Sequence, residues 1–438
     1  MRSWLLNAPD RIEGTLRVPG DKSISHRSLL LGALAHGVTE VCGFLRGEDC
    51  LATLHALRAL GTTIGETAGG GLQIHGAGPE ALREPPGVLD AGNSGTSLRL
   101  LAGLLAGRPF FSVLTGDPSL RSRPMRRIVE PLGAMGATLL GRGGGEYPPL
   151  AIRGGGLRGI DWHSPVASAQ VKSAILLAGL QARGETSVTE PALSRDHTER
   201  MLAAFGVPLE RRGAAVAVRG GARLRATRIT VPGDVSSAAF FLVAAAAWAG
   251  AEMCIQGVGV NATRTGLLDV LARMGGTVVQ EHAHIQGGEP VADLRVRGVR
   301  LRGTRIEGED IPRLIDEVPV LAVAAALADG ETVISGAGEL RVKEVDRLAA
   351  LASELGRLGA AITTEGDSLR IAGGHRLRGA VVSSRGDHRM AMSLAIAGLF
   401  AAGETRVEDV GCVETSFPGF ARLLKAAAPG CGIREIAD

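Results

Sequence analysis

The stretch "DKSISHRSLLLGALAHGVTEV", residues 21–41, joins a polar lead-in, an apolar helix, a glycine and a β-branched strand. Asp21 is a residue type that caps helix amino termini, and Gly37 is suited to end the helix. Five more stretches follow the same order, and their starts recur about every seventy residues. They are "GNSGTSLRLLAGLLAGRPFFSV" (92–113), "ASAQVKSAILLAGLQARGETSV" (167–188), "DVSSAAFFLVAAAAWAGAEMCI" (234–255), "DEVPVLAVAAALADGETVI" (316–334) and "DHRMAMSLAIAGLFAAGETRV" (387–407). A fixed period of this kind indicates six copies of one strand-and-helix unit.

A second and more amphipathic helix is expected in each unit. Apolar residues recur at three- and four-residue spacing within residues 49–64, 197–209, 265–279 and 345–362. The first helices are apolar on nearly every side and should be buried, whereas the second helices should face solvent. These elements predict an α/β fold with two domains of three repeats each.

The tetrapeptide Val-Pro-Gly-Asp marks the expected domain boundaries, because it occurs at 18–21 and again at 231–234. We expect a first domain over 20–233 and a second domain that combines 1–19 with 234–438. The chain would cross between the domains near residues 20 and 233, which would form a hinge.

Composition excludes several classes of protein. With 438 residues, 45% hydrophobic and 21% charged, the chain is typical of a soluble protein. A net charge of +3 and an aromatic content of 3% argue against a nucleic-acid surface. The longest apolar run, residues 238–251, is too short to span a membrane. Five cysteines without a Cys-x-x-Cys pair indicate reduced thiols in the cytoplasm.

Basic residues occupy the lead-ins, although helix amino termini carry partial positive charge and favour acids. The segments "GDKSISHR", "GNSGTSLR", "ASAQVKS", "RVKEVDR" and "GDHRM" are expected to share one structural position. Their cations are Lys22, His26, Arg27, Arg99, Lys172, Lys343, Arg347, His388 and Arg389. Local rules broken repeatedly at equivalent places indicate a functional site. An anionic ligand bound jointly by helix amino termini and these side chains would explain the pattern.

Two carboxylates lie among these cations and have two interpretations. Asp316 and Glu344 are candidates for proton transfer, or they neutralise nearby arginines. His282 and His284 have strand spacing, but no third metal ligand is apparent. "PGDKS" lacks the Gly-Lys-[Ser/Thr] of a P-loop, so ATP is not expected as a substrate.

The motifs "PGDKSISHRS", "GNSGTSLR", "RPM" (123–125), "SAQVKS", "RVKEVDRL" and "GDHRMAMS" together resemble the 5-enolpyruvylshikimate-3-phosphate (EPSP) synthase family over essentially the whole chain. The resemblance implies an inside-out α/β barrel in two domains, built from six βαβαββ units. It implies transfer of the enolpyruvyl group of phosphoenolpyruvate to the 5-hydroxyl of shikimate 3-phosphate, with release of phosphate. Neither metal nor organic cofactor is implied, and we expect a cytoplasmic monomer that acts on small anionic substrates.

The resemblance also implies roles for individual residues. Shikimate 3-phosphate would be bound by Lys22, Ser23, Arg27, Ser168, Ala169, Gln170, Arg195, Asp316 and Lys343. Phosphoenolpyruvate would be bound by Lys22, Gly95, Arg123, Gln170, Arg347 and Arg389. The implied catalytic residues are Asp316 as the acceptor of the hydroxyl proton, Glu344 as the donor to the methylene carbon, Lys22 and His388. Glyphosate occupies the phosphoenolpyruvate site in this family, and strongly tolerant members carry alanine at the position of Gly95.

Thr415 and Glu339 depart from the pattern of many members, which have lysine and asparagine at these positions. Together with "RDHTE" (195–199) and "NATR" (261–264), they indicate the class II branch of the family. Two alternatives remain open at this point. One is the sister enzyme that acts on UDP-N-acetylglucosamine, although its loop cysteine is absent from "TGDPSLRSRPMRR" (115–127). The other is a nucleic-acid-binding protein built from related repeats, which the few aromatics and low charge disfavour.

Overall fold

A computed structural model describes residues 2–437 of the chain. The chain forms two compact units. The first contains residues 2–19, 232–284 and 290–437, and the second contains residues 20–231 and 285–289. The hinge near residues 20 and 233 stays a prediction.

Strand pairing gives six four-stranded sheets, three in each unit, and no closed barrel of strands within residues 2–437. The sheets of the second unit are β14 (Arg228–Thr230)–β3 (His36–Cys42)–β5 (Leu72–Ala77)–β4 (Thr63–Glu66), β6 (Leu89–Asp90)–β7 (Phe111–Thr115)–β9 (Tyr147–Arg153)–β8 (Thr138–Gly141) and β10 (Asp161–His163)–β11 (Glu185–Thr189)–β13 (Ala215–Arg219)–β12 (Glu210–Arg212). Those of the first unit are β16 (Thr277–Gln286)–β17 (Glu289–Arg297)–β15 (Glu252–Gly259)–β2 (Glu13–Leu16), β18 (Arg305–Ile306)–β19 (Glu331–Ile334)–β21 (Ser368–Ala372)–β20 (Ala361–Glu365) and β22 (Val381–Ser383)–β23 (Thr405–Glu408)–β1 (Arg2–Leu6)–β24 (Arg434–Ala437). Each sheet joins one parallel pair to antiparallel neighbours. The six predicted repeats and the α/β class are therefore confirmed.

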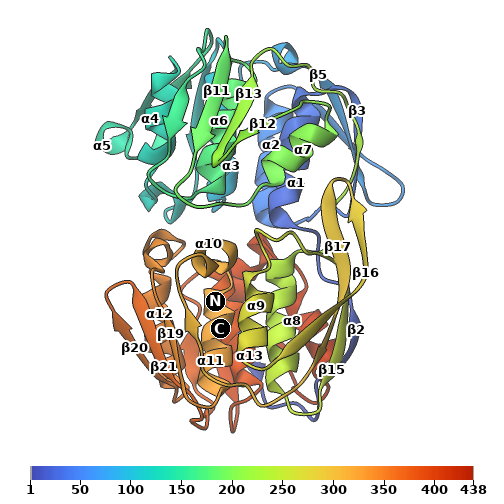
Figure 1. Cartoon of the computed structure of the whole chain (residues 1–438), viewed down its shortest axis with the longest axis vertical. Coiled ribbons are helices and arrows are strands. Elements are labelled where there is room, and N and C mark those ends of the chain that lie inside the picture. The colour runs from blue at the N-terminus through green and yellow to red at the C-terminus, as the bar shows by residue number, and fades with distance from the viewer. Residues whose placement is uncertain (1, 438) are drawn as a thin grey trace. The chain divides into compact units, whose positions relative to one another are not determined.

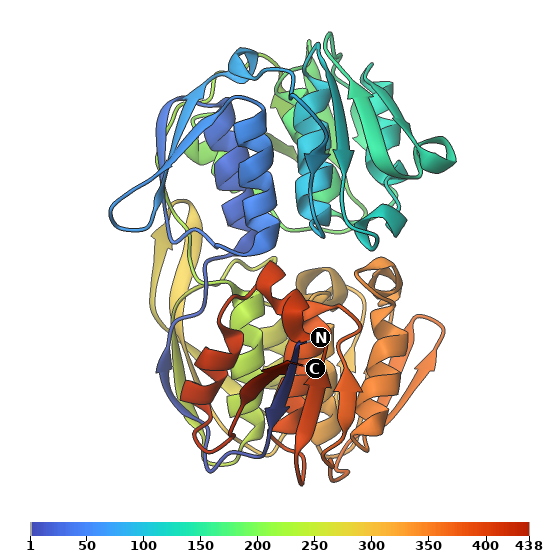
Figure 2. The ribbon, with the colours of Figure 1, turned by 180° about the vertical axis from the view of Figure 1, so that it is seen from behind.

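The first helix of each repeat begins where the sequence pattern predicts. These helices are α1 (Lys22–Leu34), α3 (Gly95–Ala106), α6 (Ala169–Gly179), α8 (Val235–Ala247), α11 (Val318–Leu327) and α13 (His388–Gly398). Their side chains are buried almost throughout, and in α11 every residue from Val318 to Ala326 is buried. Figures 1 and 2 show the helices inside each unit and the sheets on its outside. Burial on all sides follows from helices that are apolar all round.

The second helices are α2 (Glu48–Ala59), α4 (Arg126–Ala134), α7 (His197–Ala204), α9 (Gly266–Arg273), α12 (Arg347–Arg357) and α14 (Phe420–Ala427). The expectation that they face solvent is only half right. In α12, Leu348, Leu351 and Leu355 are fully buried, while the opposite face is exposed. An amphipathic helix stabilises the fold by burying its apolar stripe, so these helices form the outer part of each core.

Several short elements complete the structure: α5 (Arg142–Gly145), α10 (Asp310–Leu314) and the 3₁₀ turns η1 (Pro79–Ala81), η2 (Leu120–Ser122), η3 (Gly338–Val342) and η4 (Val410–Thr415). Each unit has its own apolar core. Between residues 2 and 437, no helix combines the length and apolarity that a bilayer crossing requires.

The closest helix packing in the second unit is between α3 and α6, at Gly103. A Cβ atom at Gly103 would lie 2.2 Å from the carbonyl oxygen of Ala174 and 2.7 Å from its Cα. These are backbone atoms of a neighbouring helix, so they yield only if the whole helix moves.

We predict that Gly103→Ala lowers the free energy of unfolding by about 1–3 kcal/mol, because the added methyl group forces α3 and α6 apart. Gly133→Ala is the matched control, since Gly133 lies in α4 of the same unit and an added methyl group meets no atom within 4 Å. This control should be neutral or slightly stabilising. Urea denaturation of both variants measures the difference, and equal stability would contradict the packing described here.

Candidate functional site

The buried first helices share an unusual amino terminus. Side chains cap five of them, namely Asp21, Ser94, Ser168, Asp234 and Asp387. None of the six has an acidic residue within its first turn. Each cap accepts from only one or two of the free N–H groups, so the other N–H groups and the positions that usually hold acids remain open to an external anion or to cations.

In the second unit, α1 presents Lys22, His26 and Arg27. The Lys22 ammonium lies 2.9 Å from Asp49 Oδ2, at the start of α2. The side chain of Lys22 is 18% exposed, so its ammonium is paired and still accessible. His26 is fully buried, and its Nδ1 lies 2.8 Å from the hydroxyl of Thr53. Burial, and then the neighbouring charges of Lys22 and Arg27, hold the pKa of His26 well below its usual value.

Arg27 is a buried cation surrounded by hydroxyls. Its Nε donates to Thr198 Oγ1 at 2.7 Å, and one terminal nitrogen donates to Ser173 Oγ at 2.6 Å. Burial lowers the pKa of Arg27 to about 10, although Glu199 and other acids oppose the shift. Arg195 acts in the same direction as burial, so it lies close enough to repel Arg27. With a second cation nearby and hydrogen bonds to neutral oxygens, Arg27 is suited to bind an anion.

Gly95, Arg99 and Gln170 meet at the starts of α3 and α6. Gln170 accepts a hydrogen bond from Arg99 at 2.6 Å and donates to Thr96 Oγ1 at 2.9 Å. Arg123 is 6% exposed and donates to Asn93 Oδ1 at 2.7 Å. A Cβ atom at Gly95 would lie 2.9 Å from an Arg99 nitrogen and 3.4 Å from an Arg123 nitrogen. The glycine therefore leaves space beside two guanidinium groups.

At the start of α6, Ser168 caps the helix and its backbone N–H donates to Glu190 at 2.9 Å. Ala169 is the first residue of this helix. Lys172 departs from the expectation of a ligand-binding cation. Its ammonium is 1% exposed and lies 2.8 Å from Glu190 and 2.9 Å from Glu199. Carboxylates that the sequence pattern did not reveal thus neutralise Lys172 inside the fold.

The first unit places Arg347 among three carboxylates. Arg347 is 1% exposed, and its nitrogens lie 2.7 Å from Asp387, 2.6 Å from Glu344 and 3.6 Å from Asp316. Burial alone would lower the pKa of Arg347, but these carboxylates, Asp387 above all, outweigh burial and raise it. Arg347 is therefore a permanent buried cation.

Two further cations lie close to Asp316. Lys343 Nζ lies 3.5 Å from Asp316, and an Arg389 nitrogen lies 3.8 Å from it. Arg389 also donates to the backbone carbonyl of Asp316 at 2.9 Å. His388, the first residue of α13, is 4% exposed. The structure thus brings Asp316, Lys343, Glu344, Arg347 and Arg389 into one cluster.

One sequence interpretation is wrong. The segment "RVKEVDR" does not occupy the position of the other lead-ins, because it runs from η3 into α12, the second helix of its repeat. The first helix of that repeat, α11, begins after Asp316 and Glu317 instead. Asp316 lies within 4 Å of both Lys343 and Arg347, so its negative charge reduces the repulsion between these two cations.

Other candidates have local partners. Thr415 donates to the carbonyl of Cys412 at 2.7 Å and is 9% exposed. His282 lies within β16 with a left-handed backbone (φ 51°), and its Nδ1 lies 3.0 Å from Asp293. Among the residues that the structure describes, no three His, Cys, Asp or Glu side chains gather as a metal site would require.

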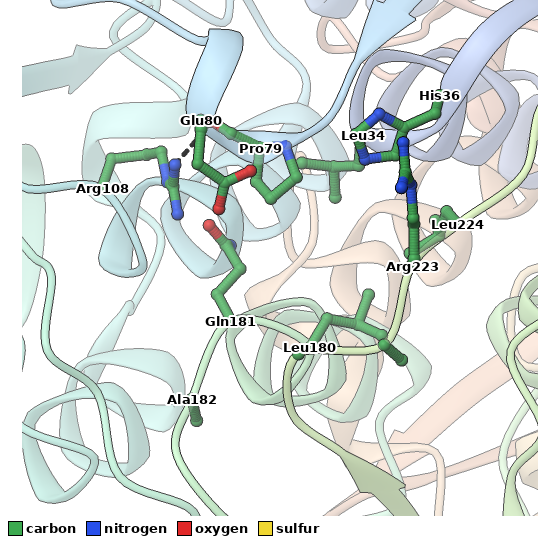
Figure 3. A pocket seen from close by; sticks show the side chains of 12 residues that line it. Leu34, His36, Pro79, Glu80, Arg108, Leu180, Gln181, Ala182, Arg223 and Leu224 are labelled. Carbon is green, nitrogen blue, oxygen red and sulfur yellow. Dashed lines mark hydrogen bonds between the residues drawn. The ribbon is translucent and has the colours of Figure 1, made fainter.

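A cavity of about 420 Å³ lies in the second unit, at the carboxyl ends of α1, α3 and α6. Figure 3 shows Arg108, Glu80 and Gln181 on one side of this cavity, and His36 with Arg223 on the other. Arg108 donates to the carbonyl of Pro79. None of the candidate site residues lines the cavity. Cations are favoured at helix carboxyl ends, which accounts for these basic side chains without a ligand.

Sequence reasoning missed most of the partners. Asp49, Asn93, Asp387 and Glu190 each orient a cation, yet the sequence does not show which cation each of them would contact. Asp387 alone gave a signal, because an acid before "HRM" caps a helix.

Comparisons with known proteins agree with this geometry. The family model described as "EPSP synthase (3-phosphoshikimate 1-carboxyvinyltransferase)" matches residues 6–424. The 3-phosphoshikimate 1-carboxyvinyltransferase of Desulforamulus reducens is 55% identical over 421 residues, covering 96% of this chain and 98% of that protein. The one from Desulforudis audaxviator is 57% identical over 415 residues, covering 95% and 97%. The solved structure of EPSP synthase from Acinetobacter baumannii matches with a TM-score of 0.88 at 46% identity, covering 99% of this chain and 100% of that one.

The buried His26 predicts a pH dependence of stability. Its pKa is lowered in the folded state, so below pH about 6.5 the unfolded chain binds a proton that the folded chain does not. Stability is therefore lost as the pH falls, and His26 should account for a loss on the order of 1 kcal/mol between pH 7.5 and 5.5. Urea denaturation of His26→Gln should show a correspondingly weaker pH dependence.

His75→Gln is the matched control, because His75 is an exposed histidine of the same unit. If His26→Gln and the unmodified chain lost the same stability on acidification, the buried neutral state of His26 would be refuted.

Proposed function

The chain belongs to the EPSP synthase family, and we propose that cations from both units bind the substrates of that family's reaction. They are Lys22, Arg27 and Arg123 in the second unit and Lys343, Arg347 and Arg389 in the first. The reaction transfers the carboxyvinyl group of phosphoenolpyruvate to the 5-hydroxyl of shikimate 3-phosphate and releases phosphate. It belongs to the biosynthesis of aromatic amino acids. Both substrates are polyanions, so the enzyme has to reduce their mutual repulsion before they can react.

The single observation that carries the assignment is a set of partly or fully buried cations at helix amino termini. Arg27, Arg347 and Arg389 are each at most 8% exposed. Burying such charges is costly. Carboxylates already offset this cost for Arg347, whereas the hydrogen bonds of Arg27 go to neutral oxygens and leave its charge for an anion. Because these cations are already placed, little reorganisation is needed during the reaction.

We assign shikimate 3-phosphate to Lys22, Ser23, Arg27, Ser168, Ala169, Gln170, Arg195, Asp316 and Lys343. The hydroxyl-lined Arg27 supports this assignment, because Ser173 and Thr198 hold its guanidinium without neutralising it. Phosphoenolpyruvate is assigned to Lys22, Gly95, Arg123, Gln170, Arg347 and Arg389. The space beside Gly95, between two guanidinium groups, supports that assignment.

In the proposed mechanism, Asp316 accepts the proton of the 5-hydroxyl as the oxygen attacks carbon 2 of phosphoenolpyruvate. Glu344 delivers a proton to the methylene carbon, so that a tetrahedral phosphate adduct forms. Loss of a proton from the new methyl group and departure of phosphate then restore the carbon–carbon double bond. Lys22 and His388 complete the proposed catalytic set, with Lys22 stabilising negative charge on the phosphate.

We also propose that the chain acts as a monomer in the cytoplasm. The five cysteines are free thiols, which suits a reducing compartment.

We predict that Lys22→Ala and Arg389→Ala each lower kcat/KM by roughly a thousandfold or more, since each removes a charge-assisted contact to substrate. Thermal unfolding should change little in Lys22→Ala, because Lys22 lies at a helix start that disfavours positive charge. Arg389→Ala leaves the buried Glu317 without its neighbouring cation, so its kcat/KM is referred to the folded fraction of the variant. Phosphate release measures turnover. Arg297→Ala is the control, as Arg297 is 74% exposed on β17. Either variant retaining more than about a tenth of the wild-type kcat/KM would refute the assigned site.

Gly95→Ala should weaken the binding of glyphosate more than the binding of phosphoenolpyruvate. The methyl group would press on Arg99 and Arg123, and a longer ligand in the same space tolerates this less well. We expect the glyphosate Ki to rise by at least about tenfold, and the KM for phosphoenolpyruvate to rise much less. Inhibition kinetics with Gly133→Ala as control measures both constants. Equal increases would mean that Gly95 does not line the part of the pocket that discriminates the two ligands.

A further inference from the structure

A line of buried polar groups connects the start of α8 to Arg389 within the first unit. It begins at Arg264, in the "NATR" segment, whose side chain is 3% exposed. Arg264 lies 3.1 Å from Asp234 and donates to Ser236 Oγ at 2.7 Å. Arg264 is not among the proposed substrate contacts, so the burial of its guanidinium requires an explanation.

Ser236 connects Arg264 to Glu317 by hydrogen bonds. Its hydroxyl accepts from Arg264 and donates to Glu317 Oε1. The carboxylate of Glu317 is completely buried. Among residues 2–437, no hydrogen-bond donor reaches its second oxygen, Oε2. A buried carboxylate with so few donors is held in place chiefly by Ser236 and by nearby positive charge.

The positive charge near Glu317 is Arg389. A terminal nitrogen of Arg389 lies 3.6 Å from Glu317 Oε1, the same oxygen that accepts from Ser236. That nitrogen also donates to the backbone carbonyl of Asp316. Arginine has many side-chain rotamers, and two anchors on one nitrogen restrict it to a narrow set.

We propose that Glu317 is a positioning residue for Arg389, and that Arg264 and Ser236 hold Glu317 in place. Glu317 itself does not touch substrate in this account. The inference rests on the proposed role of Arg389 in binding phosphoenolpyruvate. Because contacts of a substrate-binding arginine are sensitive to shifts of about 1 Å, loosening this line should weaken that substrate selectively.

Two variants test the proposal. Ser236→Ala removes one hydroxyl and breaks the link between Arg264 and Glu317. Glu317→Gln keeps an acceptor for Ser236 and removes the charge that faces Arg389. We expect the KM for phosphoenolpyruvate to rise about threefold or more in Ser236→Ala and about tenfold in Glu317→Gln. The KM for shikimate 3-phosphate should stay within about twofold of wild type.

Ser237→Ala is the matched control, since Ser237 is the next residue of α8, is also buried, and makes none of these contacts. The double variant Ser236→Ala/Glu317→Gln should be no worse than Glu317→Gln alone, because both changes break one connected line. A general loss of structure would raise both KM values and lower the unfolding temperature.

Measuring Arg389→Ala in the same assays distinguishes an error in the proposed substrate site from an error in the positioning role of Glu317. If Arg389→Ala stays active, the proposed site is wrong. If Arg389→Ala is inactive but Ser236→Ala and Glu317→Gln behave like Ser237→Ala, only the positioning role is overturned. Additive effects in the double variant, or equal changes in both KM values, would also overturn it.

Discussion

Arg347 is enclosed by Asp316, Glu344 and Asp387, and the first unit depends on this buried cation. Asp387 also caps α13, so one carboxylate fixes both a helix start and the guanidinium. In the second unit, Asp49 lies in the first turn of α2 and orients Lys22. In the proposed function, this costly burial of charge places the cations before the substrates bind.

The repeat explains why these cations can be gathered. In each unit the buried first helices lie inside, and sheets cover them from outside (Figures 1 and 2). Lys22, Gln170 and Arg389 each lie in the first turn of such a helix. Helix amino termini add partial positive charge without any side chain. Tight packing, as at Gly103 between α3 and α6, keeps these termini fixed relative to one another. A rigid apolar interior therefore supports a polar site at the helix ends.

Much of this was predictable from the sequence, for a physical reason. The six first helices were predictable because a continuous apolar run bounded by a cap and a glycine is compatible with few structures other than a buried helix. The cations were recognisable because they occupy helix amino termini, where acidic residues are favoured. Their partners were not predictable, since Arg27 and Thr198 are 171 residues apart and Arg347 and Asp387 are 40 apart. The sequence predicts Lys172 as a ligand-binding residue, whereas in the structure it pairs with Glu190 and Glu199. The segment 341–347 was misplaced because a cationic motif does not reveal which helix of its repeat it precedes.

The central claim is that these preplaced cations select two particular anionic substrates. Acceptor dependence of phosphate release from phosphoenolpyruvate tests it most directly. The account predicts release that saturates with shikimate 3-phosphate and stays at background when UDP-N-acetylglucosamine replaces it. Release that is independent of shikimate 3-phosphate, or that is supported by UDP-N-acetylglucosamine, would contradict it.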